Sequence, residues 1–236
     1  MNQFRTFVLI LAGTFAVPWF LLLIQPSWQL SKITPVPVFE LDENGVEVLD
    51  DDGNRVITGY YPPLASGSRR QGHEIYVRQG CAQCHSQMIR SDRLTFDAYK
   101  RDWGSAPNSP IPVRTRPVNA LDYMNEDLPS IGNRRGGGDL SNLAHRFSSR
   151  ADLHLVLYDS RIGRPSSNMP AYRFLYKSRK IEGSGPSERA LALTGDLAPE
   201  EGHEIIPSDD AEALVDYLLA LRKDYTDPRK DLNDGQ

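Results

Sequence analysis

The sequence is short of cysteine, of basic charge and of long hydrophobic runs. Its 236 residues include only two cysteines, Cys81 and Cys84, so no second pair can complete a four-cysteine zinc site and no disulfide framework is available. The net charge of −4 lacks the basic excess that phosphate binding needs, which argues against nucleic acid as a partner. One uncharged apolar stretch of eighteen residues, 7–24, is long enough to cross a membrane. The chemistry of the chain must therefore centre on its single cysteine pair.

Both cysteines belong to one motif, C-A-Q-C-H, in which His85 follows Cys84 directly. C-x-x-C-H is the attachment signature of a c-type haem. Two thiols three positions apart on one turn can reach the two vinyl groups of a single porphyrin, and the adjacent imidazole can then bind the iron. Half of a zinc site, a thioredoxin-like redox pair and a plain disulfide are the alternatives for the C-x-x-C spacing, with His85 incidental. We expect one covalent haem c, held by Cys81, Cys84 and His85.

The apolar stretch at 7–24 favours a membrane anchor over a signal peptide. It is longer than the apolar region of a signal peptide, and no small-residue cleavage site follows it. Trp19 and Trp28 suit the membrane interface, and Pro18 is tolerated within a spanning helix. Because haem c is attached outside the cytoplasm, we expect residues 1–28 to anchor the chain once in the inner (cytoplasmic) membrane, with the haem domain in the periplasm.

Composition divides the rest of the chain. After the anchor comes an acidic stretch in which turn signals flank short β-type runs at 46–48 and 56–58, so a small hairpin is expected there. Seventeen prolines and eighteen glycines predict long loops elsewhere. The expected parts are an acidic linker or hairpin at 29–63, a haem domain at 64–224 with insertions at about 104–131 and 177–207, and a polar tail at 225–236.

Two helices frame the expected haem domain. The first spans residues 65–79, with Ser66 or Ser68 as its cap, and leads straight into the haem motif. The second spans residues 209–222, with Ser208 as its cap, acids in its first turn and an apolar face at helical spacing. A helix before C-x-x-C-H packed across a C-terminal helix is the frame of class I cytochromes c. We expect a mainly α fold: a class I cytochrome c-like haem domain with one N-terminal transmembrane helix and long loop insertions. The crossing contact is expected from Gly72, Tyr76, Tyr217 and Leu218.

The second axial ligand of such a haem must lie between those two helices. Met88 follows His85 by only three residues, which places it on the wrong side of a porphyrin, and Met124 lies in the proline-rich insertion. Met169 sits in a loop pinned by a proline, and a thioether beside a histidine raises the potential of a haem. We therefore favour His85 and Met169 as the two iron ligands. The candidates weighed are Met88, Met124, Met169, His145, His154 and His203, with His154 and His145 as the main alternatives.

The haem motif belongs to a longer series of matching segments. They are G-H-E-I-Y-V-R-Q-G-C (72–81), C-H-S-Q-M-I-R (84–90), G-N-R-R with G-G-D-L (132–140), R-F-S (146–148) and N-M-P-A-Y (168–172). In type and order these segments resemble the mono-haem cytochrome c subunit (subunit II) of cbb3-type cytochrome c oxidases, the C-type haem-copper oxidases. The resemblance covers residues 60–175 and 208–222.

The resemblance implies an electron-transfer subunit without a catalytic site of its own. Such a subunit takes electrons from another c-type cytochrome subunit or a soluble cytochrome c, and passes them to the haem-copper catalytic subunit that reduces oxygen to water. Arg134, Arg135 and Arg146 are expected near the haem, because arginines match propionate carboxylates. Gly138 stands where the family usually has proline, and its carbonyl can still accept the hydrogen bond that orients His85.

Two other functions remain open from the sequence. One is the cytochrome c subunit of a nitric oxide reductase, also a single-span mono-haem protein, which the C-H-S-Q-M-I-R segment disfavours. The other is a membrane-anchored gas-binding haem c sensor, with His85 as the only protein ligand of the iron. With one expected span and five histidines, the chain itself cannot assemble a haem-copper core.

Overall fold

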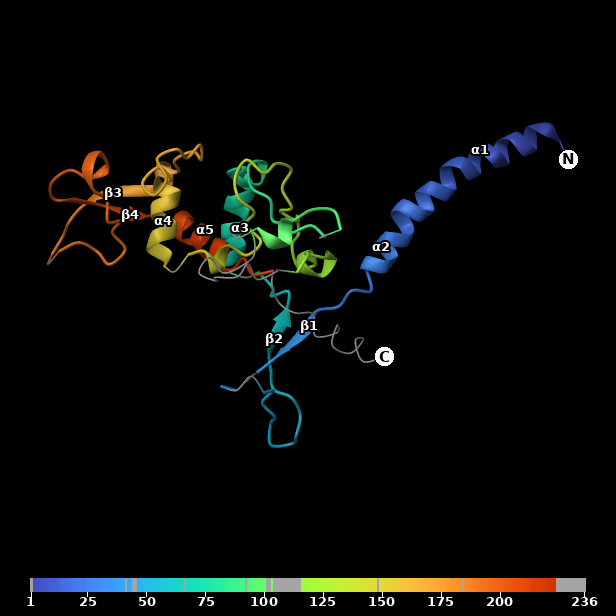
Figure 1. Ribbon diagram of the computed structural model, residues 1–236, viewed down its shortest axis with the longest axis horizontal. Helices are drawn as coiled ribbons and strands as arrows, with labels where there is room; N and C mark the ends of the chain where they lie inside the picture. Colours follow the sequence, from blue (N-terminus) through green and yellow to red (C-terminus); the bar gives the residue numbers. More distant parts are fainter. Residues whose placement is uncertain are drawn as a thin grey trace. The chain divides into compact units, whose positions relative to one another are not determined.

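The computed structural model describes residues 2–40, 42–43, 46–65, 67–91, 93–100, 103, 116–147, 149–183 and 185–223. The chain divides into two compact units, Met1–Pro63 with Asn119–Asn125, and Leu64–Val118 with Glu126–Gln236. The described residues form a mixture of helices and two small antiparallel sheets, with one apolar helix at the N-terminus (Figure 1). Residues 104–115 of the expected proline-rich insertion and the whole polar tail lie outside the described residues.

The N-terminal helix runs without interruption from Gln3 to Leu30. It consists of α1 (Gln3–Trp19), a π-helical segment (Phe20–Ile24) and α2 (Gln25–Leu30), none of which has a buried residue. The π-helical segment lies between Pro18 and Pro26, each of which lacks the N–H that a regular turn uses. The 28 residues are apolar enough to cross a membrane, a property that signal sequences share.

A two-stranded sheet completes the first unit. Strand β1 (Val36–Phe39) pairs antiparallel with β2 (Ile57–Tyr61), and Val36 faces Tyr61. The expected hairpin is confirmed in part: the Val56 N–H donates to the Val48 carbonyl at 3.0 Å and Leu49 bridges Arg55, whereas residues 57–61 pair with β1. The physical reason is burial, because Val36 and Tyr61 pack with Leu121, whereas Val46 is exposed.

Three helices build the second unit: α3 (Ser68–Arg78), α4 (Arg150–Tyr158) and α5 (Asp209–Leu219). Helix α5 begins as expected, with the Ser208 hydroxyl accepting from the Ala211 N–H at 3.3 Å, and it ends three residues earlier than predicted. Helix α3 is preceded by Gly67, which gives no side-chain cap, so the expectation that Ser68 caps it is wrong. Ser68 instead donates to Asp216 on α5. The alternative cap, Ser66, lies outside the described residues.

Helices α3 and α5 cross (Figure 1), and the predicted residues Gly72, Tyr76 and Tyr217 lie at the crossing. A Cβ atom at Gly72 would lie 1.9 Å from the Ala213 carbonyl oxygen, so only glycine allows this approach. The rings of Tyr76 and Tyr217 lie 5.3 Å apart between centroids. The crossing forms the main core, and each large apolar side chain buried there contributes about 1.5–3 kcal/mol. The large buried apolar members of the core are Ile75, Leu140, Leu143, Leu153, Leu157, Leu175, Leu214, Val215, Leu218 and Leu221.

The region expected as a loop insertion at 177–207 contains a second sheet. Strand β3 (Tyr176–Lys180) pairs antiparallel with β4 (His203–Pro207), and Tyr176 faces Pro207. The pair is held by an ion pair across it, in which Arg179 Nε donates to Glu204 at 2.7 Å. The short 3₁₀ turns within the described residues are Cys81–Gln83, Asp97–Tyr99, Ala120–Tyr123, Leu143–His145, Arg173–Leu175 and Gly195–Leu197.

Candidate functional site

The C-x-x-C-H motif forms a compact turn directly after α3. Gly80 takes a left-handed conformation with φ of 69°, which ends the helix and starts the 3₁₀ turn Cys81–Gln83. The backbone N–H groups of Cys84 and His85 both donate to the Cys81 carbonyl, at 3.1 and 2.9 Å. Cys81 is half-buried and Cys84 is exposed, and both are free thiols. The turn therefore brings both thiols and the imidazole to one place, as haem attachment requires.

His85 is oriented by the loop that contains Gly138. Its Nδ1 atom lies 2.8 Å from the Gly138 carbonyl oxygen, so the orienting hydrogen bond expected at this position is confirmed. Because a carbonyl oxygen only accepts, Nδ1 carries the proton and Nε2 of the neutral ring carries the lone pair. The imidazole is thus in the tautomer that leaves Nε2 available to a metal.

Two glycines, Gly132 and Gly137, lie close to His85. A Cβ atom at Gly137 would lie 2.3 Å from His85 Cε1, and one at Gly132 would lie 2.3 Å from the His85 carbonyl oxygen. Gly132 also has a φ of +82°, which disfavours any other residue. The Gly137 N–H donates to the Cys84 carbonyl at 2.8 Å, which holds the glycine loop on the motif.

Asp139 fixes the same loop, a role that the sequence analysis missed. Its carboxylate is fully buried and accepts from the Ser86 hydroxyl at 2.6 Å, the Met88 N–H at 2.8 Å and the Ser141 N–H at 2.8 Å. The signal available in the sequence was an acidic residue in a glycine-rich segment, because an acid that becomes buried there needs hydrogen-bond partners for its charge. Asp139 thereby ties the residues after the haem motif to the loop that orients His85.

Met169 lies in the loop between α4 and β3, half-buried against the main core. Cys81, Ala82 and Tyr172 pack against that same core. Burial raises the pKa of the Cys81 thiol, while the Tyr172 hydroxyl, which hydrogen-bonds to it, acts in the opposite direction. Burial also raises the pKa of Tyr172, to about 12, so this hydroxyl keeps its proton. The Tyr172–Cys81 contact connects the Met169 loop to the haem motif.

The three arginines expected near a haem occupy different surroundings. Arg135 donates to Asp97 at 2.7 Å and to the Met88 carbonyl at 2.6 Å. Arg146 donates to the Asp139 carbonyl, and Arg134 is exposed. Two of the three are thus bonded to protein groups beside the motif, and a role toward propionates stays a prediction for all three.

Asp97 is the second acid that the sequence analysis missed. Its side chain is 1% exposed and lies beside two arginines, Arg90 at 2.8 Å and Arg135 at 2.7 Å. Burial alone raises the pKa of Asp97, but the hydrogen bonds from these arginines hold it well below its usual range. Asp97 therefore stays charged and orders the segment that follows C-H-S-Q-M-I-R.

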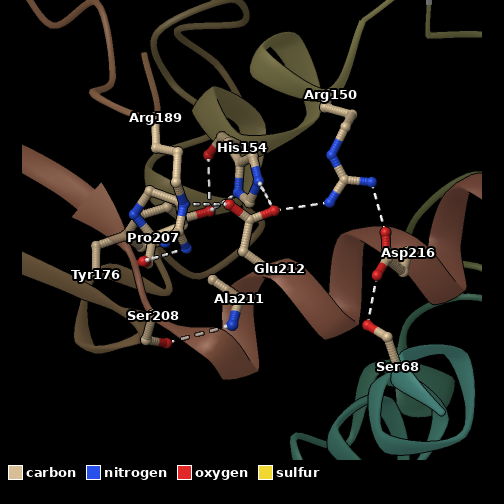
Figure 2. A network of polar contacts seen from close by, with 10 residues as sticks. All are labelled: Ser68, Arg150, His154, Tyr176, Arg189, Pro207, Ser208, Ala211, Glu212 and Asp216. Atoms are coloured by element: carbon tan, nitrogen blue, oxygen red, sulfur yellow. Dashed lines mark hydrogen bonds and ion pairs between the residues drawn. The ribbon is translucent and has the colours of Figure 1, made fainter. Parts of the chain in front are cut away.

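The alternative ligand His154 lies in a polar network between α4, β3 and α5 (Figure 2). Its Nδ1 atom is 3.1 Å from the Tyr176 hydroxyl and its Nε2 atom is 3.4 Å from the Glu212 carboxylate. The same carboxylate accepts from Arg150 at 2.7 Å and from Arg189 at 3.0 Å. Both ring nitrogens of His154 thus have protein partners, which disfavours it as an iron ligand. His145 ends the 3₁₀ turn Leu143–His145 and is half-buried.

The other side chains that could ligate a metal, within the described parts of the chain, do not form a metal-binding site. There, no three His, Cys, Asp or Glu side chains gather where they could hold a metal ion. A haem iron needs only one ligand of these types, because its other expected ligand is a thioether. No protein-family model and no curated protein matches this chain.

Proposed function

We propose that this chain is the mono-haem electron-transfer subunit of a membrane-bound cbb3-type cytochrome c oxidase. It carries one covalent haem c and relays electrons to a haem-copper catalytic subunit that reduces oxygen to water. The single observation that carries the proposal is the hydrogen bond from His85 Nδ1 to the Gly138 carbonyl, at 2.8 Å. That bond leaves Nε2 as a metal ligand immediately beside two free thiols.

The residues present fit a covalent haem. Cys81 and Cys84 supply two thiols on one turn, and His85 supplies an oriented imidazole. Ala82, Phe147, Met169 and Tyr172 supply half-buried apolar surface that packs against the same core as Cys81. The α3–α5 crossing at Gly72, directly before the motif, agrees with a class I cytochrome c arrangement. When bound, the haem supplies one-electron redox chemistry.

The protein's own part is to hold the group and to keep its surroundings fixed. His85 is held by Gly138, and its ring is confined by Gly137, so the ligand cannot rotate freely. Met169 is proposed as the second ligand. With two protein ligands, the site suits electron transfer and does not suit the binding of a gas.

The N-terminal helix supports a membrane location for the protein, and the family resemblance suggests its partner subunits. The helix Gln3–Leu30 would act as an inner-membrane anchor, with the haem domain in the periplasm. The proposed partners are the haem-copper catalytic subunit and, as electron donor, another c-type cytochrome subunit or a soluble cytochrome c. With one proposed span and five histidines, the chain cannot by itself assemble a haem-copper core.

The proposal is tested by haem attachment and by ligand identity in the full-length protein. Wild-type protein should give haem stain on a denaturing gel, and the double variant Cys81→Ala with Cys84→Ala should give none. Met169→Leu keeps the side-chain volume and should remove the weak far-red sulfur-to-iron absorption band, lower the midpoint potential and allow CO to bind the reduced protein. Met88→Leu and Met124→Leu are the matched controls and should leave all three properties unchanged.

Two outcomes would contradict the proposal. Persisting stain in the double cysteine variant would show that the haem is not attached through this motif. An unchanged band and potential in Met169→Leu would show that Met169 only packs, and the ligand would then be sought at His145 and His154. Co-purification with subunits that hold additional haems and copper, counted by a haem and metal inventory, tests the assignment to an oxidase.

A further inference from the structure

The loop that carries Met169 gains little from burial. Every side chain of residues 161–166 is exposed, including Ile162 at 42%, and Asn168 is exposed too. Met169 is only half-buried. Because burial cannot fix such a segment, its path must be set by polar contacts at its ends.

One buried carboxylate joins both ends of this loop. Asp159 follows α4 directly, and its side chain is 3% exposed. It accepts from Arg161 through Nε at 2.8 Å, Nη2 at 2.7 Å and the backbone N–H at 3.1 Å. Arg173, which lies beyond the far end of the loop, donates to the same carboxylate and places its guanidinium 5.5 Å from the Tyr158 ring centroid. The Asp159 carboxylate therefore links the start of the loop, through Arg161, to the segment after its end, through Arg173.

Within the loop, Met169 is held at its backbone on both sides. The Met169 N–H donates to the Ser167 hydroxyl at 3.3 Å, and the buried Ser160 hydroxyl lies 3.3 Å from the Met169 carbonyl oxygen. Ser160 also donates to Ser167 at 2.8 Å. After Met169 the chain returns to α4, where the Tyr172 N–H donates to the Leu157 carbonyl at 2.9 Å. The two contacts made by the Ser160 hydroxyl depend on residue 160 keeping its place, and residue 160 is next to Asp159.

We propose that Asp159 is a positioning residue that closes the 160–170 loop and so presents Met169 to the site. The inference rests on the proposed function, in which Met169 is an iron ligand. Asp159 acts through Arg161 and Arg173 and does not itself touch a reacting atom. Hydrogen bonds from Arg161 hold the pKa of Asp159 well below its usual range, so the carboxylate is charged at neutral pH.

The test compares Asp159→Asn with a matched control in the full-length protein. Glu204→Gln is that control, because Glu204 is also a buried carboxylate, 5% exposed, bonded to one arginine at 2.7 Å and to the Ser187 N–H at 2.6 Å. It lies on β4, away from the Met169 loop in sequence. Hydrogen exchange of a peptide spanning 160–172 and the far-red sulfur-to-iron band are the two readouts. Arg173→Gln, which leaves the Asp159–Arg161 bonds in place, serves as a milder second variant should Asp159→Asn fold poorly.

We expect amide exchange in 160–172 to become roughly tenfold faster or more in Asp159→Asn, the factor associated with losing a charge-assisted hydrogen bond. The far-red band should weaken and the reduced protein should bind CO, whereas Glu204→Gln should change neither. Unchanged exchange in 160–172 would overturn the proposal whatever the haem ligands are. Faster exchange with an intact band would reduce Asp159 to a merely structural role and also overturn it. Failure of the proposed function is seen separately, as an unchanged band in Met169→Leu.

Discussion

Replacing Gly137 by alanine should displace the His85 ring. The added Cβ would lie 2.3 Å from Cε1, 2.6 Å from Nδ1 and 2.8 Å from Nε2 of His85, distances that no real Cβ tolerates. The backbone cannot easily retreat, because the Gly137 N–H donates to the Cys84 carbonyl at 2.8 Å. The φ of Gly137 is outside the left-handed region, so alanine suffers no backbone strain there and the destabilisation starts from the steric clash with the ring.

The magnitude follows from two contributions. Forcing a methyl group into a packed site costs about 1–3 kcal/mol. Moving the ring also removes the bond from Nδ1 to Gly138, which is worth about 0.5–1.5 kcal/mol net. The free energy of unfolding should therefore fall by roughly 2–4 kcal/mol, which lowers the urea midpoint by about 1–2 M for a typical dependence on denaturant.

The neighbouring glycine supplies the control for this prediction. A Cβ at Gly136 would meet nothing within 4 Å, so Gly136→Ala should leave stability unchanged or raise it by about 0.4–1 kcal/mol. Urea unfolding followed by circular dichroism on the full-length protein gives the comparison. Equal midpoints for the two variants would refute the reasoning, because they would mean that the His85 ring does not occupy the position described.

Two further predictions concern the second unit as a whole. Gly72→Ala should lower the free energy of unfolding by about 1–3 kcal/mol or more, because its Cβ would lie 1.9 Å from the Ala213 carbonyl oxygen. The control Gly163→Ala should not lower it, because a Cβ there would meet nothing within 4 Å. Equal urea midpoints for the two variants would contradict the crossing contact. Burial lowers the pKa of His154 from 6.5. Just below pH 6.5 this histidine is therefore protonated in the unfolded chain and neutral in the folded chain. The free energy of unfolding should fall as the pH drops below about 6.5. His154→Gln should remove this loss of stability at low pH. Urea midpoints compared between about pH 8 and pH 5, above the range where ordinary carboxylates titrate, measure it. An identical pH profile in the variant would show that His154 is not the group responsible.

Local signals in the sequence predict much of the site. The haem motif, the Ser208 cap and the apolar face of α5 are all read within one or two turns of chain. The contact between Gly72 and α5 was predictable because a glycine within a helix needs a packing reason. The bond between His85 and Gly138 spans 53 positions and was predictable only through the family resemblance. Helix α4 had a usable signal that the sequence analysis did not use, the Ser149 hydroxyl that accepts from the Asp152 N–H at 3.1 Å.

Pairings between distant segments could not be read in the same way. Residues 46–48 and β1 both contain short apolar runs, and the burial of Val36 with Tyr61 and Leu121 favours the pairing of β1 with β2. Strands β3 and β4 are separated by 22 residues in the sequence, so their pairing is not visible locally. Arg135 looked free to bind a propionate because nothing near it in sequence shows that Asp97, 38 positions earlier, accepts its hydrogen bond.

The hydrogen bond that orients His85 has an evolutionary consequence, because its acceptor belongs to the main chain. Any residue at position 138 supplies a carbonyl oxygen, and a Cβ there would meet only the flexible end of Arg146, at 3.2 Å. Position 138 is therefore free to drift, whereas position 137 admits no side chain beside the ring and position 132 requires a positive φ. Selection on this site should act on Gly132 and Gly137 and spare the residue that makes the contact. Homologous chains can thus differ at 138 and keep the same tautomer of the same histidine.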